Sequence, residues 1–286
     1  MRLIAGCAAW LLLAACAGDN PPPPSTATAL PTPAPAIAGQ VRLAGSGAAT
    51  PLVREALALL RPRTPGTTWL LEDSVGSAGG VAAVADGAVD VGLVSRPLND
   101  AERALGLEVE TVATDAVVVA AHPDVAVEGL GADQLRALYS GKTRTFPDGS
   151  HASVLLRDRG ESANGVLERA VPGLTAGRTG DLPFRVLFHD AAMVEALAST
   201  PGAIGVSSLA LLSGAQARLK VLALDGLRPD ADALEQGRWP ATRPISLVYR
   251  PERREAVAPL LGLLRSAEGA ELARRAGYRP APGRAP

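Results

Sequence analysis

The chain has 286 residues, of which 47% are hydrophobic and 20% are charged, and its formal net charge at pH 7 is −1. This composition excludes a disordered chain and a membrane protein with many spans, and it leaves room for one large domain or two small ones. The balance of 28 basic and 29 acidic residues provides no positive field for a nucleic acid, so we expect no nucleic-acid partner.

The first sixteen residues have the pattern of a bacterial export signal. Arg2 is followed by an uncharged apolar run over residues 3–15, which is too short to span a bilayer. The run ends in Leu-Ala-Ala-Cys, which resembles the lipobox of bacterial lipoproteins. The resemblance implies that residues 1–15 are a signal peptide and that Cys16 carries a lipid. An ordinary cleaved signal with an incidental cysteine is the alternative.

Residues 16–39 are rich in proline and contain an unbroken run over positions 21–24. Such a segment cannot bury a core and favours extended polyproline II, so it predicts a tether between the lipid and the folded part. Cys7 and Cys16 are the two cysteines of the chain. Removal of the leader and acylation of Cys16 would leave no thiol for a disulfide or a metal site.

From residue 40 onward, short β-like runs alternate with helical ones, which predicts an α/β fold. In chain order we expect a strand over 41–44, a helix over 51–60, a strand over 68–71, a helix over 81–85, a strand over 89–94, a helix over 99–105, a strand over 109–121, a helix over 132–139, a strand over 154–157, helices over 163–171 and 190–197, strands over 203–206 and 245–249, and a helix over 252–276. Asn99 and Glu102 have the spacing of a capping box. Asp190 is the expected N-cap of its helix, and Pro259 is expected to break the last helix.

Three turns between a strand and a helix are rich in small residues and open directly into the helix. They cover residues 45–51, 74–80 and 157–164. Small residues let a ligand approach the backbone, and the unpaired amides and dipole of a helix N-terminus favour negative charge. Arg157 adds a planar guanidinium that matches two oxygens. The three turns together predict an anion-binding site.

In this order and spacing, the three turns resemble the ligand loops of the phosphate-binding solute receptors of bacterial ABC transporters. The similarity extends to residues 89–98, 138–142, 146–149, 201–205 and 277–278. It implies the two-lobed type II periplasmic-binding-protein fold, in which each lobe is a mixed sheet flanked by helices. Residues 40–114 plus 247–286 would form lobe 1, and residues 115–246 would form lobe 2.

The resemblance also implies the ligand and the residues that hold it. The expected ligand-binding residues are Ser46, Gly47, Ser77 and Ser95 in lobe 1 and Arg157, Ser162, Ala163 and Asn164 in lobe 2. The protein would capture inorganic phosphate or a related oxyanion for import through an ABC permease. It would be a monomer and no enzyme, with no cofactor and no metal.

Three positions depart from the best-known receptors of this family. Gly47 stands where they have a threonine, so one hydroxyl is missing. Ser95 stands where some members have an aspartate, which can accept the proton of hydrogen phosphate and repel sulfate. The third loop has one extra residue before Ser162, and Asn164 replaces a threonine, so the register of this loop stays open by one position.

Other functions find less support in the residues. The loop over 45–50 resembles half of a dinucleotide-binding fingerprint, but its third glycine is missing. The serines of the three turns lie in neither Gly-x-Ser-x-Gly nor Ser-x-x-Lys motifs, which argues against a hydrolase. His122, His151 and His189 lack the spacing of metal ligands.

The sequence leaves one alternative function open, that of a non-transport envelope lipoprotein with the same fold, acting as an anion sensor or an assembly partner. Ala17, rather than an aspartate, follows the proposed lipidation site. We therefore expect a lipid-anchored protein of the periplasm or cell envelope, with the inner and the outer membrane both possible.

Overall fold

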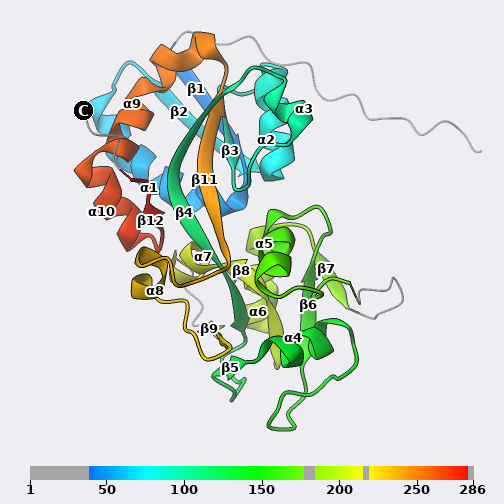
Figure 1. Ribbon diagram of the computed structural model, residues 1–286. Helices are drawn as coiled ribbons and strands as arrows, with labels where there is room; N and C mark the ends of the chain where they lie inside the picture. Colours follow the sequence, from blue (N-terminus) through cyan, green and yellow to red (C-terminus); the bar gives the residue numbers. More distant parts are fainter. Residues whose placement is uncertain (1–38, 177–183, 215–218, 283–286) are drawn as a thin grey trace, which may run out of the picture. The chain divides into compact units, whose positions relative to one another are not determined.

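The computed structural model describes residues 39–176, 184–214 and 219–282 (Figure 1). Cys16, the leader and the Pro-rich segment up to residue 38 lie outside the described residues. Strands and helices alternate through this part of the chain, which confirms the predicted α/β class.

The bounds of the elements are as follows. The strands are β1 (Gln40–Gly45), β2 (Thr68–Ser74), β3 (Val91–Val94), β4 (Glu108–Ala121), β5 (Gly129–Leu130), β6 (Ser153–Arg157), β7 (Arg185–Leu187), β8 (Ala203–Ser208), β9 (Lys220–Val221), β10 (Ala223–Leu224), β11 (Thr242–Tyr249) and β12 (Arg279–Pro280). The helices are α1 (Thr50–Leu60), α2 (Gly76–Ala85), α3 (Asp100–Arg103), α4 (Ala132–Tyr139), α5 (Ser162–Ala170), α6 (Asp190–Ser199), α7 (Leu209–Gly214), α8 (Ala231–Glu235), α9 (Arg254–Arg265) and α10 (Ala267–Arg275). Within the described ranges, no helix has both the length and the apolar character needed to cross a membrane.

Most strands belong to one mixed sheet with the order β2-β1-β3-β11-β4-β8-β6-β7, and β9 and β12 also pair with β4. β4 is 14 residues long and pairs with β11 up to Ala116 and with β8 from Val117 onward. Figure 1 shows β4 and β11 running side by side. Instead of a separate sheet for each lobe, the strands thus form one hydrogen-bonded path through β4, and β5 and β10 form a small second sheet.

Side chains of β1, β3 and β11 alternate between two hydrophobic clusters. Leu43, Leu93 and Leu247 belong to a cluster that includes the apolar residues of α1, α9 and α10. Their neighbours Ala44 and Val94 belong to a smaller cluster with residues of α2. Since successive side chains of a strand point to opposite faces, both faces of this part of the sheet are covered by helices.

A third hydrophobic cluster has its buried members between Ala116 and Ala241. The first two clusters take theirs from residues 41–113 and 245–278, with Ala210 as an addition. The chain therefore leaves the first two clusters within β4 and returns to them within β11.

Of two helix boundaries predicted from local sequence, one is confirmed by the structure and one is wrong. Asn99 and Glu102 form the predicted capping box on α3, with reciprocal hydrogen bonds of 2.9 Å. The predicted break at Pro259 is wrong, because Pro259 lies inside α9. The helix instead ends at Arg265, and Ser266 caps α10 by accepting a hydrogen bond from the amide of Gly269 at 3.1 Å. Val257 before Pro259 and Leu260, Leu261, Leu263 and Leu264 after it are buried, and their packing holds α9 together despite the lost donor.

Candidate functional site

The loops that follow β1, β2, β3, β6 and β7 meet around one small pocket with a volume of about 200 Å³. Four of the predicted ligand residues, Ser46, Gly47, Ser77 and Ser162, line it. The other lining residues are Ser74, Val75, Gly76, Ala78, Arg96, Asp158, Gly160, Glu161, His189 and Asp190. The pocket thus lies at the carboxyl ends of strands, where open α/β sheets bind ligands.

Glycine makes the first loop possible. Gly45 has a φ of +143°, and a β-carbon there would lie 2.2 Å from the carbonyl oxygen of Leu93 in the neighbouring strand. The close approach lets the amide of Ser46 donate to that carbonyl at 2.8 Å. This bond holds Ser46 at the start of the loop, with its side chain directed toward Ser95 just after β3.

Four hydroxyl groups gather at the floor of the pocket, and we call Ser46, Ser77, Ser95 and Ser162 the serine cluster. Ser95 is fully buried, and its Oγ lies 2.7 Å from that of Ser46, 2.9 Å from that of Ser162 and 3.3 Å from that of Ser77. The Ser95 amide also donates to Ser77 Oγ at 3.0 Å. Ser95 therefore lies below the lining and connects residues that the sequence assigned to different lobes.

Ala163 and Asn164 lie near the pocket but not in its lining. Ala163 is buried in the third hydrophobic cluster. Asn164 Nδ2 donates to the carbonyl oxygen of Asp158 at 2.5 Å and so fixes the loop that precedes α5. In the structure, Asn164 shapes the site through this loop.

Two helix N-termini point their first turns at the pocket. α2 begins at Gly76 and α5 at Ser162, both of which line it. The side chains of the preceding residues, Val75 and Glu161, accept no hydrogen bond from these first turns. The uncapped amides and the positive ends of the helix dipoles make this place favourable for an anion.

Arg157, at the end of β6, is 2% exposed and lies next to the pocket, behind two carboxylates of its lining. Its Nη2 atom is 2.8 Å from Oε2 of Glu161 and 3.4 Å from Oδ1 of Asp190. These are ion-pair distances without hydrogen-bond alignment, and none of the three guanidinium nitrogens has a hydrogen-bond partner among the described residues. A buried guanidinium with unsatisfied N–H groups is costly unless an acceptor is supplied.

Asp190 is a site residue that the sequence interpretation missed. It was expected to be the N-cap of its helix, but His189 is the N-cap and Asp190 is the first residue of α6. It reaches Arg157 instead, and its Oδ2 atom lies 2.6 Å from where a β-carbon of Gly47 would be. The carboxylate that the sequence analysis found missing at position 95 is thus present in the pocket on another element.

Arg243 and Asp115 form a second missed feature, a buried ion pair between the two crossing strands. Arg243 Nε donates to Asp115 Oδ2 at 2.9 Å, and Ser208 Oγ donates to the other carboxylate oxygen at 2.7 Å. Burial alone would lower the pKa of Arg243, but the carboxylates of Asp115 and Asp190 raise it, so the guanidinium stays charged. Arg243 Nη1 donates to Ser162 Oγ at 2.8 Å and so connects this pair to the pocket.

A sequence signal for this pair existed. Asp115 is the one charged residue between Val112 and Ala121, and Arg243 directly precedes the apolar end of β11. Isolated opposite charges in two strands that read as buried indicate a pair, because a buried charge needs a partner.

The chemistry of the pocket is that of capture. The hydroxyls of the serine cluster bond one another, the Ser95 amide and Arg243, and within the described chain none of them bonds a histidine that would take its proton. Among the described residues, no three histidine, cysteine or acidic side chains are placed together to hold a metal ion. The arrangement offers donors and carboxylate acceptors to a small polar ligand.

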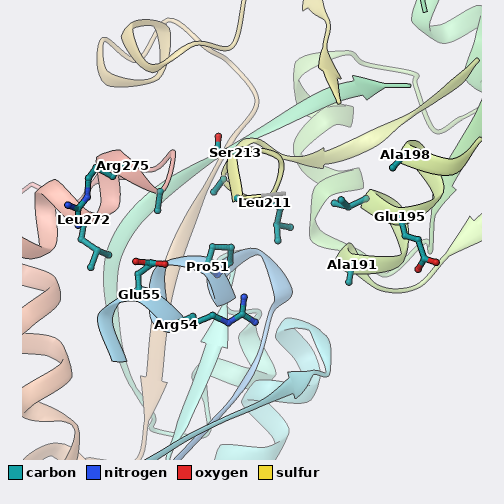
Figure 2. A pocket seen from close by; sticks show the side chains of 14 residues that line it. Pro51, Arg54, Glu55, Ala191, Glu195, Ala198, Leu211, Ser213, Leu272 and Arg275 are labelled. Atoms are coloured by element: carbon teal, nitrogen blue, oxygen red, sulfur yellow. The ribbon is translucent and has the colours of Figure 1, made fainter. Parts of the chain in front are cut away.

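Two larger grooves of about 680 and 800 Å³ adjoin this region. Figure 2 shows the first, which is lined by Arg54 and Glu55 of α1, Leu211 of α7 and Glu195 of α6. None of the buried polar atoms that lack a partner in the described ranges belongs to the lining of these grooves. The smaller pocket is the candidate site, because two uncapped helix N-termini and the serine cluster meet there and Arg157 lies next to it.

Comparison with known proteins gives one family match and several relatives. A family model described as a PBP superfamily domain matches residues 30–265. The phosphate-binding protein PstS of Bacillus subtilis (strain 168) is 26% identical over 208 residues, which are 71% of this chain and 67% of that protein.

Two solved structures share the fold. A putative phosphate ABC transporter substrate-binding protein from Clostridium perfringens, solved with bound phosphate, has a TM-score of 0.76 at 18% identity and covers 85% of this chain and 100% of its own. An ABC-type phosphate transport receptor from Vibrio cholerae has a TM-score of 0.64 at 20% identity, with coverages of 85% and 100%. At sequence identities this low, the similarity shows a shared fold but does not identify the ligand.

Proposed function

We propose that this chain, which belongs to the PBP superfamily, is an extracytoplasmic receptor that captures inorganic phosphate or a similar tetrahedral oxyanion and delivers it to an ABC-type permease. The chain is a distant relative of phosphate-binding proteins, and like that family it binds a substrate and is not an enzyme. The ligand, the site residues and the permease are our proposal.

The observation that carries the proposal is the environment of Arg157. Its guanidinium is buried with no hydrogen-bond partner in the described chain, next to a pocket where α2 and α5 present uncapped first turns. An oxyanion can accept from the arginine fork, from helix amides and from serine hydroxyls at once. We assign the ligand to Ser46, Gly47, Ser77, Ser95, Arg157 and Ser162, with Ala163 contributing a first-turn amide and Asn164 the loop geometry.

The size of the pocket supports a small ligand. Its volume of about 200 Å³ is below the range of about 300–1,000 Å³ that is typical of sites for organic ligands. A tetrahedral oxyanion fits this space without an organic substituent.

The carboxylates support phosphate over sulfate. Glu161 and Asp190 both line the pocket and can only accept hydrogen bonds when ionised. Hydrogen phosphate has a proton to donate to such an acceptor, whereas sulfate has none and would be repelled. Asp190 then performs the discrimination that Ser95 cannot.

Closure of two lobes would bury the bound ion. The pocket combines loops from residues 46–96 with loops from residues 158–190, and we propose residues 40–114 plus 247–286 as lobe 1 and residues 115–246 as lobe 2. The exclusion of water upon closure would strengthen each hydrogen bond to the ligand. We further propose that Cys16 anchors the receptor to a membrane of the envelope by a lipid.

The test is calorimetric titration of the full chain, freed of bound anions, with phosphate and sulfate in turn. We expect a phosphate Kd in the micromolar range or below, and sulfate binding at least about tenfold weaker. Equal binding of both would keep an oxyanion receptor and reject phosphate selectivity. A folded protein that binds neither would reject the proposal and favour the assembly partner among the non-transport alternatives.

A further inference from the structure

Arg243 stands at the start of a chain of hydrogen bonds that leads to the pocket. Its Nη1 atom donates to Ser162 Oγ at 2.8 Å. Ser162 Oγ lies 2.9 Å from Ser95 Oγ, and Ser95 Oγ lies 2.7 Å from Ser46 Oγ. We call the three hydroxyls the serine string. Both of its ends, Ser162 and Ser46, line the pocket, whereas Arg243 does not.

The chemistry of arginine restricts the direction of these bonds. A guanidinium has donors and no acceptor, so Ser162 Oγ must accept from Arg243. The Ser162 hydrogen is then available to Ser95 or to a ligand. If it goes to Ser95, that hydroxyl donates in turn to Ser46 at 2.7 Å or to Ser77 at 3.3 Å, and the hydrogen of the accepting serine is available to the pocket, which both residues line. In each arrangement a serine hydroxyl presents a hydrogen to the pocket.

We propose that Arg243 is a positioning residue, which orients the serine string so that its hydroxyl groups donate to the bound oxyanion. This inference rests on the proposed function, because the oxyanion is the ligand proposed there. Ionised oxygens accept strong hydrogen bonds, and donors that are already oriented cost less to order on binding.

The surroundings of Arg243 suit a residue that orients the hydroxyl of Ser162 better than one that provides positive charge to the ligand. Asp115 neutralises its charge at 2.9 Å, and Ser208 fixes the carboxylate from the other side at 2.7 Å. Arg243 is 2% exposed, so its guanidinium has little freedom to rotate. Its Nη2 atom has no hydrogen-bond partner in the part of the chain that the structure describes. The fixed fork therefore acts on the pocket through Nη1 and Ser162.

A double-mutant cycle tests the inference. Phosphate affinity is measured by calorimetry for the full chain, for Arg243→Lys, for Ser162→Ala and for the double variant. Lysine keeps the charge beside Asp115 but lacks the second arm that reaches Ser162. We expect Arg243→Lys to weaken phosphate binding about tenfold, as for one charge-assisted hydrogen bond, and to change affinity less than about twofold once Ser162 is alanine.

Arg253→Lys is the matched control. Arg253 also pairs through Nε with a buried aspartate, Asp90, at 2.8 Å, but it lies outside the pocket lining. We expect its affinity for phosphate to equal that of the wild type. Should Arg243→Lys fail to fold, Ser208→Ala replaces it, because loss of the bond to Asp115 loosens Arg243 while the arginine stays in place.

The outcomes separate this inference from the proposed function. A loss in Arg243→Lys, or in Ser208→Ala if that replaces it, that disappears in the Ser162→Ala background supports the positioning role. Equal losses in both backgrounds overturn it, since Arg243 would then act independently of the serine string. A wild-type protein that binds no phosphate overturns both the function and the inference.

Discussion

The carboxylate of Asp190 lies directly against Gly47. A β-carbon at position 47 would lie 2.6 Å from Oδ2 of Asp190 and 3.3 Å from its β-carbon. The other carboxylate oxygen, Oδ1, is 3.4 Å from Nη2 of Arg157. Asp190 thus contacts the first loop and the arginine together, and any side chain at position 47 would compete with it for space.

Gly47→Ala should disturb ligand binding more than folding. The methyl group would displace the carboxylate of Asp190, which pairs with Arg157, while the nearest atom to give way is the end of a side chain and not backbone. We expect phosphate affinity to fall about tenfold, equal to about 1.4 kcal/mol. Calorimetry and a thermal melt measure the two effects. Gly66→Ala is the control, because nothing lies within 4 Å of its β-carbon position; an equal loss of affinity there would contradict the steric explanation.

Asp190→Asn should reduce the preference for phosphate over sulfate. The amide keeps the size of the side chain but removes the charge that repels sulfate and offers donors to its oxygens. We expect the ratio of sulfate to phosphate Kd to fall at least about tenfold. Competition between the two anions measures it. Glu195→Gln, an exposed change in the adjoining groove, should leave the ratio unchanged, and an unchanged ratio in Asp190→Asn would refute the role of Asp190.

Arg157→Lys should cost most of the affinity. The lysine can keep a charge near Glu161 and Asp190 but has no planar fork for two oxygens. We expect phosphate binding to weaken by about 2–4 kcal/mol, since more than one charge-assisted hydrogen bond is lost. Arg136→Lys on α4, where Nη2 pairs with Asp133 at 2.6 Å, serves as the surface control. Wild-type affinity in Arg157→Lys would remove Arg157 from the site.

Glu102 predicts a pH dependence of stability. Two hydrogen bonds of 2.6 Å from Arg96 lower the pKa of the Glu102 carboxyl. Because the pKa is lower in the folded than in the unfolded chain, the pair stabilises the fold above the unfolded pKa near 4.3, and this contribution is lost as the pH falls through the folded value.

The measurement is the free energy of unfolding of Glu102→Gln and of wild type between pH 3 and pH 7. We expect the wild type to be more stable by about 1–2 kcal/mol at pH 7 and the difference to decrease steadily toward the acidic end. Arg96→Gln removes the other partner and should give the same profile. A difference that stays constant with pH would contradict the ion-pair origin.

Cys16→Ser should abolish lipid attachment. The full chain, expressed in a bacterium with lipoprotein-processing enzymes, is expected to gain the mass of the acyl groups and to sediment with membranes. The serine variant should be processed differently and appear without that mass. Mass spectrometry of the N-terminal peptide decides, and an unmodified Cys16 in the wild type would favour an ordinary signal peptide.

Much of the α/β pattern could be predicted, because strand and helix signals are local. The strand predicted over 203–206 lies within β8, and the helix predicted over 132–139 coincides with α4. The break predicted at Pro259 is wrong, because burial of Val257 and of the leucines that follow the proline outweighs one lost hydrogen bond. The single path of strands through β4 also depends on pairing between distant segments, which no local pattern encodes.

Some residues of the candidate site could also be predicted from local sequence, and others could not. Ser46, Gly47, Ser77 and Ser162 were found through glycine- and serine-rich loops, which are contiguous in sequence. Asp190 and Arg243 come from single positions that the fold brings to the loops over long sequence distances, 33 residues from Arg157 to Asp190 and 81 from Ser162 to Arg243. Their roles depend on the positions of their charged groups in the folded chain. From the sequence alone, Asp190 could equally be a helix cap and Arg243 a surface charge.

The long strand β4, with 14 residues, restricts where residues can be inserted into or deleted from this chain. Adjacent side chains of a strand point to opposite faces, so one inserted residue before Asp115 would turn every later side chain of β4 to the other face. Asp115 would then point away from Arg243, and the buried ion pair would be lost. Insertions and deletions can therefore accumulate in the loops between strands, whereas β4 must keep its length for both ends of the sheet at once.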